Sequence, residues 1–148
     1  MRGDLTATQI FLLYALPAVD FCIPKERREE TRQRLERALQ HPDEISIEEI
    51  AKTFPRGFKE FPELKQFTKP LVVQYWEVEH NKIVDNSNRP DYDKRLCKVY
   101  ETVVSKVDLD QGFVNTSDNK LIILPKYHHD IRVGDKITTH KSQVARIK

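Results

Sequence analysis

Glycine and cysteine are scarce in this 148-residue chain, which contains four glycines and two cysteines. A glycine-rich loop that cradles phosphate is therefore not expected, and the sequence has none of the motifs GxGxxG, Walker A, GxSxG or HExxH. Two cysteines cannot form a disulfide framework, and a reduced pair is the state expected inside a cell. These absences argue against nucleotide-driven chemistry and against a small disulfide-stabilised domain.

Long apolar runs and a strong charge of one sign are also missing. The longest apolar run, residues 10–19, is interrupted by Pro17 and is shorter than the roughly 20 residues that cross a bilayer. Asp4 and Asp20 flank it, which is unlike a signal peptide, so we interpret it as a buried helix and expect a cytoplasmic protein without a membrane partner. The net charge is +2, too small for an overall field that drives binding to nucleic acid or an anionic membrane. Only residues 91–148, which are mildly basic, give a hint of a polyanionic partner.

Prolines are concentrated in the first 90 residues, where the sequence pattern is helical. Residues 6–16 begin with Thr6 and Gln9 at capping-box spacing and end before Pro17, which predicts a helix. Residues 24–40 carry few apolar side chains and many opposite charges at i,i+4 spacing, which is typical of a solvated surface helix.

Two more helices are expected before residue 85. Ser46 and Glu49 again stand at capping-box spacing, and Thr68 can cap an amphipathic helix that continues to residue 84. Between them, the aromatic and proline-containing segment 55–67 predicts a loop or short helical turn whose phenylalanines fill the core.

The pattern changes after the polar segment 85–95, which has no apolar period and predicts a linker. Beyond it, short segments rich in β-branched residues alternate with turn sequences. Five short strands in so few residues favour a small closed barrel of the OB or SH3-like kind, because a small open sheet would leave exposed edges. The predicted fold is α+β, with a helical domain at 1–88 and a small five-stranded β-barrel domain at 89–148.

Three histidines near the C-terminus raise the possibility of a metal site. Neighbouring residues on an extended strand point to opposite faces, so only one of His128 and His129 is expected to join His140 around an ion. Cys97 and Asp130 would complete the three or four ligands that zinc requires. The alternative is that these histidines decorate a polar loop of the barrel, and the loose spacing favours that alternative.

Cys97 is the better candidate of the two cysteines for a functional thiol. Lys94, Arg95 and Lys98 surround it in the sequence, and cationic neighbours favour the nucleophilic, metal-binding thiolate. Cys22 stands in an apolar context and is expected in the core. An enzyme that uses Cys97 and a histidine would also need a positioned base and an oxyanion site, neither of which the sequence indicates.

A nucleic-acid-binding module is the second class of function that fits a small barrel. OB and SH3-like barrels bind single strands through basic and aromatic side chains on one face. The predicted barrel contains side chains of both types: Lys98, Tyr100, Lys106, Phe113, Lys120, Lys126, Tyr127 and Lys141.

The barrel segment also has an order of features typical of one family. Cys97 opens the first predicted strand, a VGD turn at 133–135 precedes a strand that ends in His140, and Val144 and Ile147 lie in a last aliphatic strand. This order resembles the HypC-type hydrogenase assembly chaperones. The resemblance implies a non-catalytic accessory protein that binds a metalloenzyme subunit or a maturation factor. It also implies that Cys97 binds an iron fragment or docks the partner, with His140 nearby.

Overall fold

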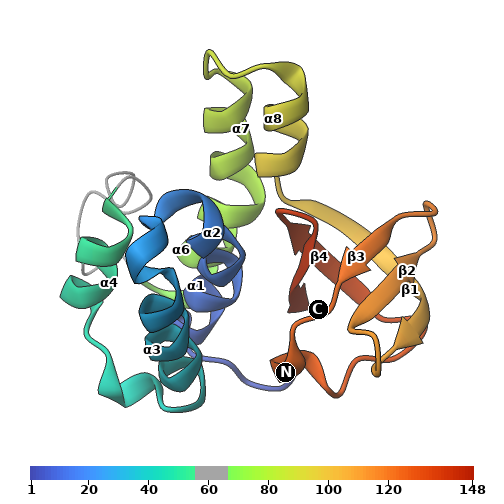
Figure 1. Ribbon diagram of the computed structural model, residues 1–148, viewed down its shortest axis with the longest axis horizontal. Helices are drawn as coiled ribbons and strands as arrows, with labels where there is room; N and C mark the ends of the chain where they lie inside the picture. Colours follow the sequence, from blue (N-terminus) through green and yellow to red (C-terminus); the bar gives the residue numbers. More distant parts are fainter. Residues whose placement is uncertain (56–66) are drawn as a thin grey trace. The chain divides into compact units, whose positions relative to one another are not determined.

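The computed structural model describes residues 1–55 and 67–148, in which helices are followed by a closed five-stranded barrel (Figure 1). The predicted α+β class is therefore confirmed. The chain forms two compact units, one of Leu5–Tyr75 and one that combines Met1–Asp4 with Trp76–Lys148. These units are groups of mutually contacting residues, and the domain division after residue 88 stays a prediction.

The unit of Leu5–Tyr75 is entirely helical in its described part. Its elements are α1 (Ala7–Ala15), η1 (Leu16–Ala18), α2 (Val19–Cys22), η2 (Lys25–Arg27), α3 (Arg28–Gln40), η3 (Pro42–Glu44), α4 (Ile47–Thr53) and α6 (Lys69–Gln74). Helix α1 packs against α3 and α6 and is buried from Ile10 to Ala15. The ring of Phe11 lies 6.4 Å from that of Phe54 and 5.7 Å from that of Phe67, between centroids.

Side chains at the helix ends explain where these helices begin. The hydroxyl oxygen of Thr6 accepts a hydrogen bond from Gln9 N at 3.1 Å, and the Gln9 side chain accepts one from Thr6 N at 2.9 Å. The predicted capping box is thus present. Ser46 also caps its helix by accepting from Glu49 N, whereas Thr68 occupies the cap position without a capping hydrogen bond. The surface character predicted for α3 is confirmed, since only Leu35, Ala38 and Leu39 are buried. The predicted aromatic loop falls mostly on residues 56–66, outside the described part of the chain.

The second unit begins with helical segments and ends with the barrel. Its elements are the π-helix η5 (Tyr75–Glu79, of which Tyr75 belongs to the first unit), α7 (His80–Asp85), α8 (Asp91–Cys97), β1 (Tyr100–Asp108), β2 (Phe113–Thr116), β3 (Leu121–Ile123), η6 (Lys126–His128), β4 (Lys136–His140) and β5 (Gln143–Ile147). In Figure 1, α7 and α8 run side by side as a short helical pair. Glu77 of η5 forms an ion pair with Lys148 at 3.2 Å, which connects the π-helix to the end of the barrel.

The barrel closes in the order β1-β2-β3-β5-β4. Strand β1 pairs antiparallel with both β2 and β4, and the parallel pair Ile123↔Gln143 joins β3 to β5. This Greek-key closure leaves no free sheet edge. The interior is aliphatic: Val104, Val114, Ile122, Leu124, Ile131, Ile137, Val144 and Ile147.

Two sequence predictions were wrong in this region. The predicted linker contains helix α8, which follows Pro90 and carries Asp91 and Asp93 in its first turn and basic residues in its last turn. That placement of charge complements the helix dipole and stabilises a short helix. Cys97 consequently ends a helix instead of opening a strand, and β1 begins at Tyr100. Among the described residues, no helix has the length and apolar character needed to span a bilayer.

Candidate functional site

The sulfur of Cys97 lies between two cationic side chains. Lys141 Nζ is 2.7 Å from Cys97 Sγ, and an Arg89 guanidinium nitrogen is 2.9 Å from it. Cys97 is 5% exposed and Lys141 is 9% exposed, whereas Arg89 is an exposed residue. Positive charge next to a cysteine sulfur is the setting in which that sulfur acts as a nucleophile or ligand.

The turn between β4 and β5 directs Lys141 to this sulfur. His140 and Gln143 pair at the end of the two strands, and Lys141 and Ser142 form the turn between them. Their φ angles are +54° and +59°, as a type I′ hairpin requires. Non-glycine residues seldom adopt this backbone region, so the turn is unusual for its sequence.

Three rings form a cluster, and one of them contacts the backbone of the same cysteine. The ring centroid of Trp76 lies 5.0 Å from that of His80 and 5.4 Å from that of His140, and the two histidine rings are 5.2 Å apart. His80 Nε2 donates to the carbonyl oxygen of Cys97 at 2.9 Å. Burial lowers the pKa of His80, and the nearby charges of Lys141 and Arg89 lower it further. His80 therefore acts as a neutral hydrogen-bond donor that holds the end of α8 and also contacts His140.

The residues predicted as metal ligands are not gathered in one group of three or more among the described residues. His128 donates from Nε2 to the Ala145 carbonyl at 3.0 Å and is fully buried, which lowers the pKa of His128 to about 3. Asp130 forms an ion pair with the amino group of Met1. Across residues 1–55 and 67–148, no three Cys, His, Asp or Glu side chains form a group that could hold a metal ion. The side chains that contact the sulfur of Cys97 are those of Arg89 and Lys141, which are cationic residues.

Five of the residues predicted for nucleic-acid binding, Lys98, Lys141, Tyr127, Lys120 and Tyr100, are engaged in separate contacts. Lys98 pairs with Asp85 at 3.0 Å, and Lys141 contacts the sulfur of Cys97. The ring of Tyr127 meets that of His128, with 4.8 Å between centroids. Elsewhere, Lys120 lies 5.0 Å above the ring of Tyr100. Phe113 is part of β2, Lys106 of β1 and Lys126 of η6.

The outward face of β2 and β3 is apolar and was not predicted. Phe113 pairs with Ile123 and Asn115 pairs with Leu121, so these four side chains share one face. Leu121 is 60% exposed and Ile123 is 44% exposed, while Ile122 between them is buried. The segment KLIILP gives no alternation of polar and apolar residues, which is why the sequence did not indicate the exposed face.

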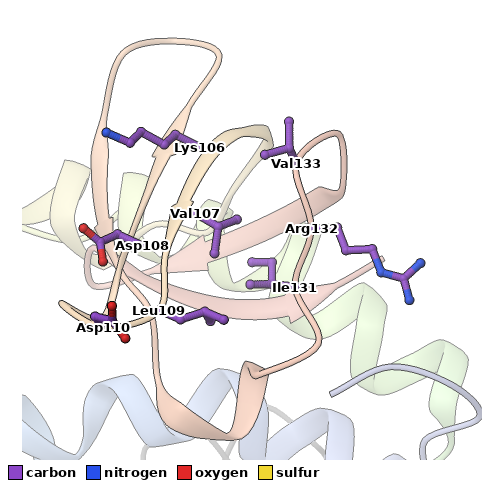
Figure 2. Close-up of a pocket in the computed structure, with 8 residues that line it drawn as sticks. All are labelled: Lys106, Val107, Asp108, Leu109, Asp110, Ile131, Arg132 and Val133. Carbon is purple, nitrogen blue, oxygen red and sulfur yellow. The ribbon is translucent and has the colours of Figure 1, made fainter.

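A shallow hollow of about 540 Å³ lies between the end of β1 and the segment before β4 (Figure 2). Val107 and Ile131 lie inside it, and the exposed residues Leu109 and Val133 stand at its margins. The charged end of Arg132 points away from it in Figure 2. Lys106, Asp108, Asp110 and Arg132 also line the hollow, so half of its lining residues are charged.

The strand order places the C-terminal part of the chain in the class of OB-type closed barrels. Comparison with protein-family models, with curated proteins and with solved structures gives no match for the chain. A barrel of this class serves many unrelated functions, so the side chains that it presents have to indicate the function.

Proposed function

We propose that this protein is a non-catalytic accessory protein that binds a protein partner through the outward face of β2 and β3. The observation that carries the proposal is an apolar row of the exposed Leu121 and Ile123 and the half-buried Phe113, on strands that contain no charged residue. Centres of protein interfaces are depleted in charge and rich in apolar and aromatic side chains. This face has that composition.

The same face is poorly suited to nucleic acid. Binding to a phosphate backbone depends on Lys and Arg side chains that neutralise phosphates, and neither β2 nor β3 contains one. Asp108 pairs with Phe113, which in turn pairs with Ile123, so a carboxylate stands in the same row. Asp110 follows in the adjoining loop. These carboxylates would repel phosphate and attract a cationic group at the margin of an apolar protein surface.

The identity of the partner is proposed from the sequence resemblance to HypC-type chaperones. The proposed partner is a metalloenzyme subunit, specifically a hydrogenase large subunit, or one of its maturation factors. Cys97 is the proposed docking residue or ligand for an iron fragment. Its sulfur is nearly buried, so the exposed Arg89 side chain has to move aside before a partner or fragment reaches it.

Substitutions on the apolar face test the proposal directly. In a pull-down and titration with a hydrogenase large subunit, Leu121→Asp and Ile123→Asp are expected to weaken binding at least about tenfold, because a carboxylate is desolvated in the interface. Val133→Asp is the matched control, since Val133 is equally exposed but lies outside the row. Cys97→Ala in the same assay reports whether the sulfur contributes to binding.

Two outcomes would contradict parts of the proposal. If the double variant of Leu121 and Ile123 binds as tightly as the wild-type protein, the face is not the interface. If the wild-type protein does not bind the large subunit or any maturation factor, the proposed partner is wrong. Far-ultraviolet circular dichroism of each variant establishes that the fold is retained.

A further inference from the structure

Cys97 and Lys141 are two reactive side chains held in direct contact. Their sulfur and nitrogen atoms are 2.7 Å apart, although the residues are separated by 44 positions in the chain. Both residues are almost completely buried. A thiol and a primary amine held at this distance are favoured to react with each other by proximity.

The surrounding structure holds both groups in place. The carbonyl oxygen of Cys97 accepts a hydrogen bond from His80, which fixes the last residue of α8. Lys141 is fixed at its backbone by the tight turn between β4 and β5. Arg89 contacts the sulfur at 2.9 Å and is itself exposed, so a small oxidant reaches the sulfur from that side when the Arg89 side chain moves aside.

We propose that Cys97 and Lys141 form a peroxide-responsive modification site, in which oxidation of the sulfur leads to a covalent sulfenamide bond between the two side chains. Sulfenic acids condense with nitrogen nucleophiles in this way. The oxidant is a hydroperoxide of small size, such as hydrogen peroxide. The inference does not depend on the β2–β3 face, but it concerns the same sulfur that is proposed to dock the partner or to bind an iron fragment.

The reaction balances in two steps. In the first, the sulfur attacks one peroxide oxygen, the O–O bond breaks, and Cys97 becomes a sulfenic acid as one water leaves. The sulfur loses two electrons and the peroxide is reduced. In the second, the Lys141 nitrogen attacks the sulfur as the neutral amine, the S–OH bond breaks, and the hydroxide leaves as a second water by taking one proton from the nitrogen. The protein loses two hydrogen atoms overall, and a thiol reductant restores both side chains.

The lysine gives Cys97 a resolving group within the same compact unit. A sulfenic acid often condenses with a second thiol, and in the described residues both cysteines are free, with Cys22 in the other unit. The S–N bond would join the end of α8 to the β4–β5 turn. A crosslink between distant positions restricts the unfolded chain, so the oxidised protein is expected to melt at a higher temperature.

The test is peroxide treatment of the full chain carrying Cys22→Ser, followed by peptide mass spectrometry. We expect a linked pair of peptides that contains Cys97 and Lys141 and has lost two hydrogen atoms. Trypsin should no longer cleave after Lys141, and dithiothreitol should restore both the cleavage and the original melting temperature. Lys126→Met, which removes an exposed lysine of the barrel, should leave the linked peptide unchanged.

Lys141→Met and Lys141→Arg distinguish the crosslink from ordinary oxidation of a thiol. Both variants should lose the linked peptide, and their Cys97 should proceed to sulfinic and sulfonic acid. The proposal is overturned if the wild-type protein gives the same oxidised forms of Cys97 as Lys141→Met, at the same rate and without a linked peptide. It is equally overturned if Cys97 stays reduced in peroxide while Cys22 of the unmodified chain is oxidised.

Discussion

The side chain of Asn81 pairs with both backbone groups of Val99. Asn81 Oδ1 accepts from Val99 N at 2.7 Å, and Asn81 Nδ2 donates to Val99 O at 2.8 Å. In an antiparallel sheet two residues exchange the same pair of hydrogen bonds. Asn81 therefore acts as a substitute strand partner one residue before β1 begins, and it connects α7 to the entrance of the barrel.

Replacing Asn81 by Leu should destabilise the protein by about 2–4 kcal/mol, because an amide N–H and a carbonyl of the buried Val99 would lose their partners. Urea unfolding followed by circular dichroism measures the change. Asn88→Leu is the matched control, since Asn88 is exposed, and it should change the midpoint little. Equal midpoints for the two variants would show that the Asn81 pair contributes nothing.

His128 should make the fold sensitive to acid. Burial lowers the pKa of His128 to about 3, whereas an unfolded histidine titrates near 6.5. Between these two pKa values the unfolded chain binds a proton at His128 and the folded chain does not. The free energy of unfolding therefore falls as the pH drops from about 6.5 towards 3. The slope from this one group approaches ~1.4 kcal/mol per pH unit.

His128→Gln tests this dependence because glutamine carries no titrating group and can still donate to the Ala145 carbonyl. Its free energy of unfolding should depend less steeply on pH between about 6 and 4 than that of the wild-type protein. His129→Gln alters the exposed neighbour and should leave the slope unchanged. The assignment fails if the two variants and the wild-type protein share one slope.

The features that the sequence predicted correctly are set by local interactions. The capping box of Thr6 and Gln9 depends on residues three positions apart. The barrel strands were indicated by short segments rich in β-branched residues between turn sequences, a pattern that is local to each strand. The environment of Cys97 depends on distant residues. Its neighbours in sequence, Lys94 and Lys98, instead contact Asp85, while Arg89 and Lys141 reach the sulfur.

The capping box gives a direct check on the helical unit. Thr6→Ala removes the hydroxyl that accepts from Gln9 N, and the loss of such a cap costs about 1 kcal/mol. Thr53→Ala is a suitable comparison because its hydroxyl donates to a carbonyl within α4 instead of capping a helix start. Thermal unfolding should show a larger decrease for Thr6→Ala, and an equal decrease would contradict the capping role.

The β4–β5 turn offers a substitution that should stabilise the protein. Ser142 has a φ of +59°, a region that costs a non-glycine residue roughly 1–2 kcal/mol. Glycine removes this cost but loses about 0.5–1 kcal/mol through its greater freedom in the unfolded chain. Ser142→Gly should therefore raise the free energy of unfolding by up to about 1.5 kcal/mol. Ser117→Gly is the control, because Ser117 is an exposed turn residue outside the positive-φ set and gains no relief of strain. It should lower stability, so a loss of equal size in both variants would mean that the turn at Ser142 stores no strain.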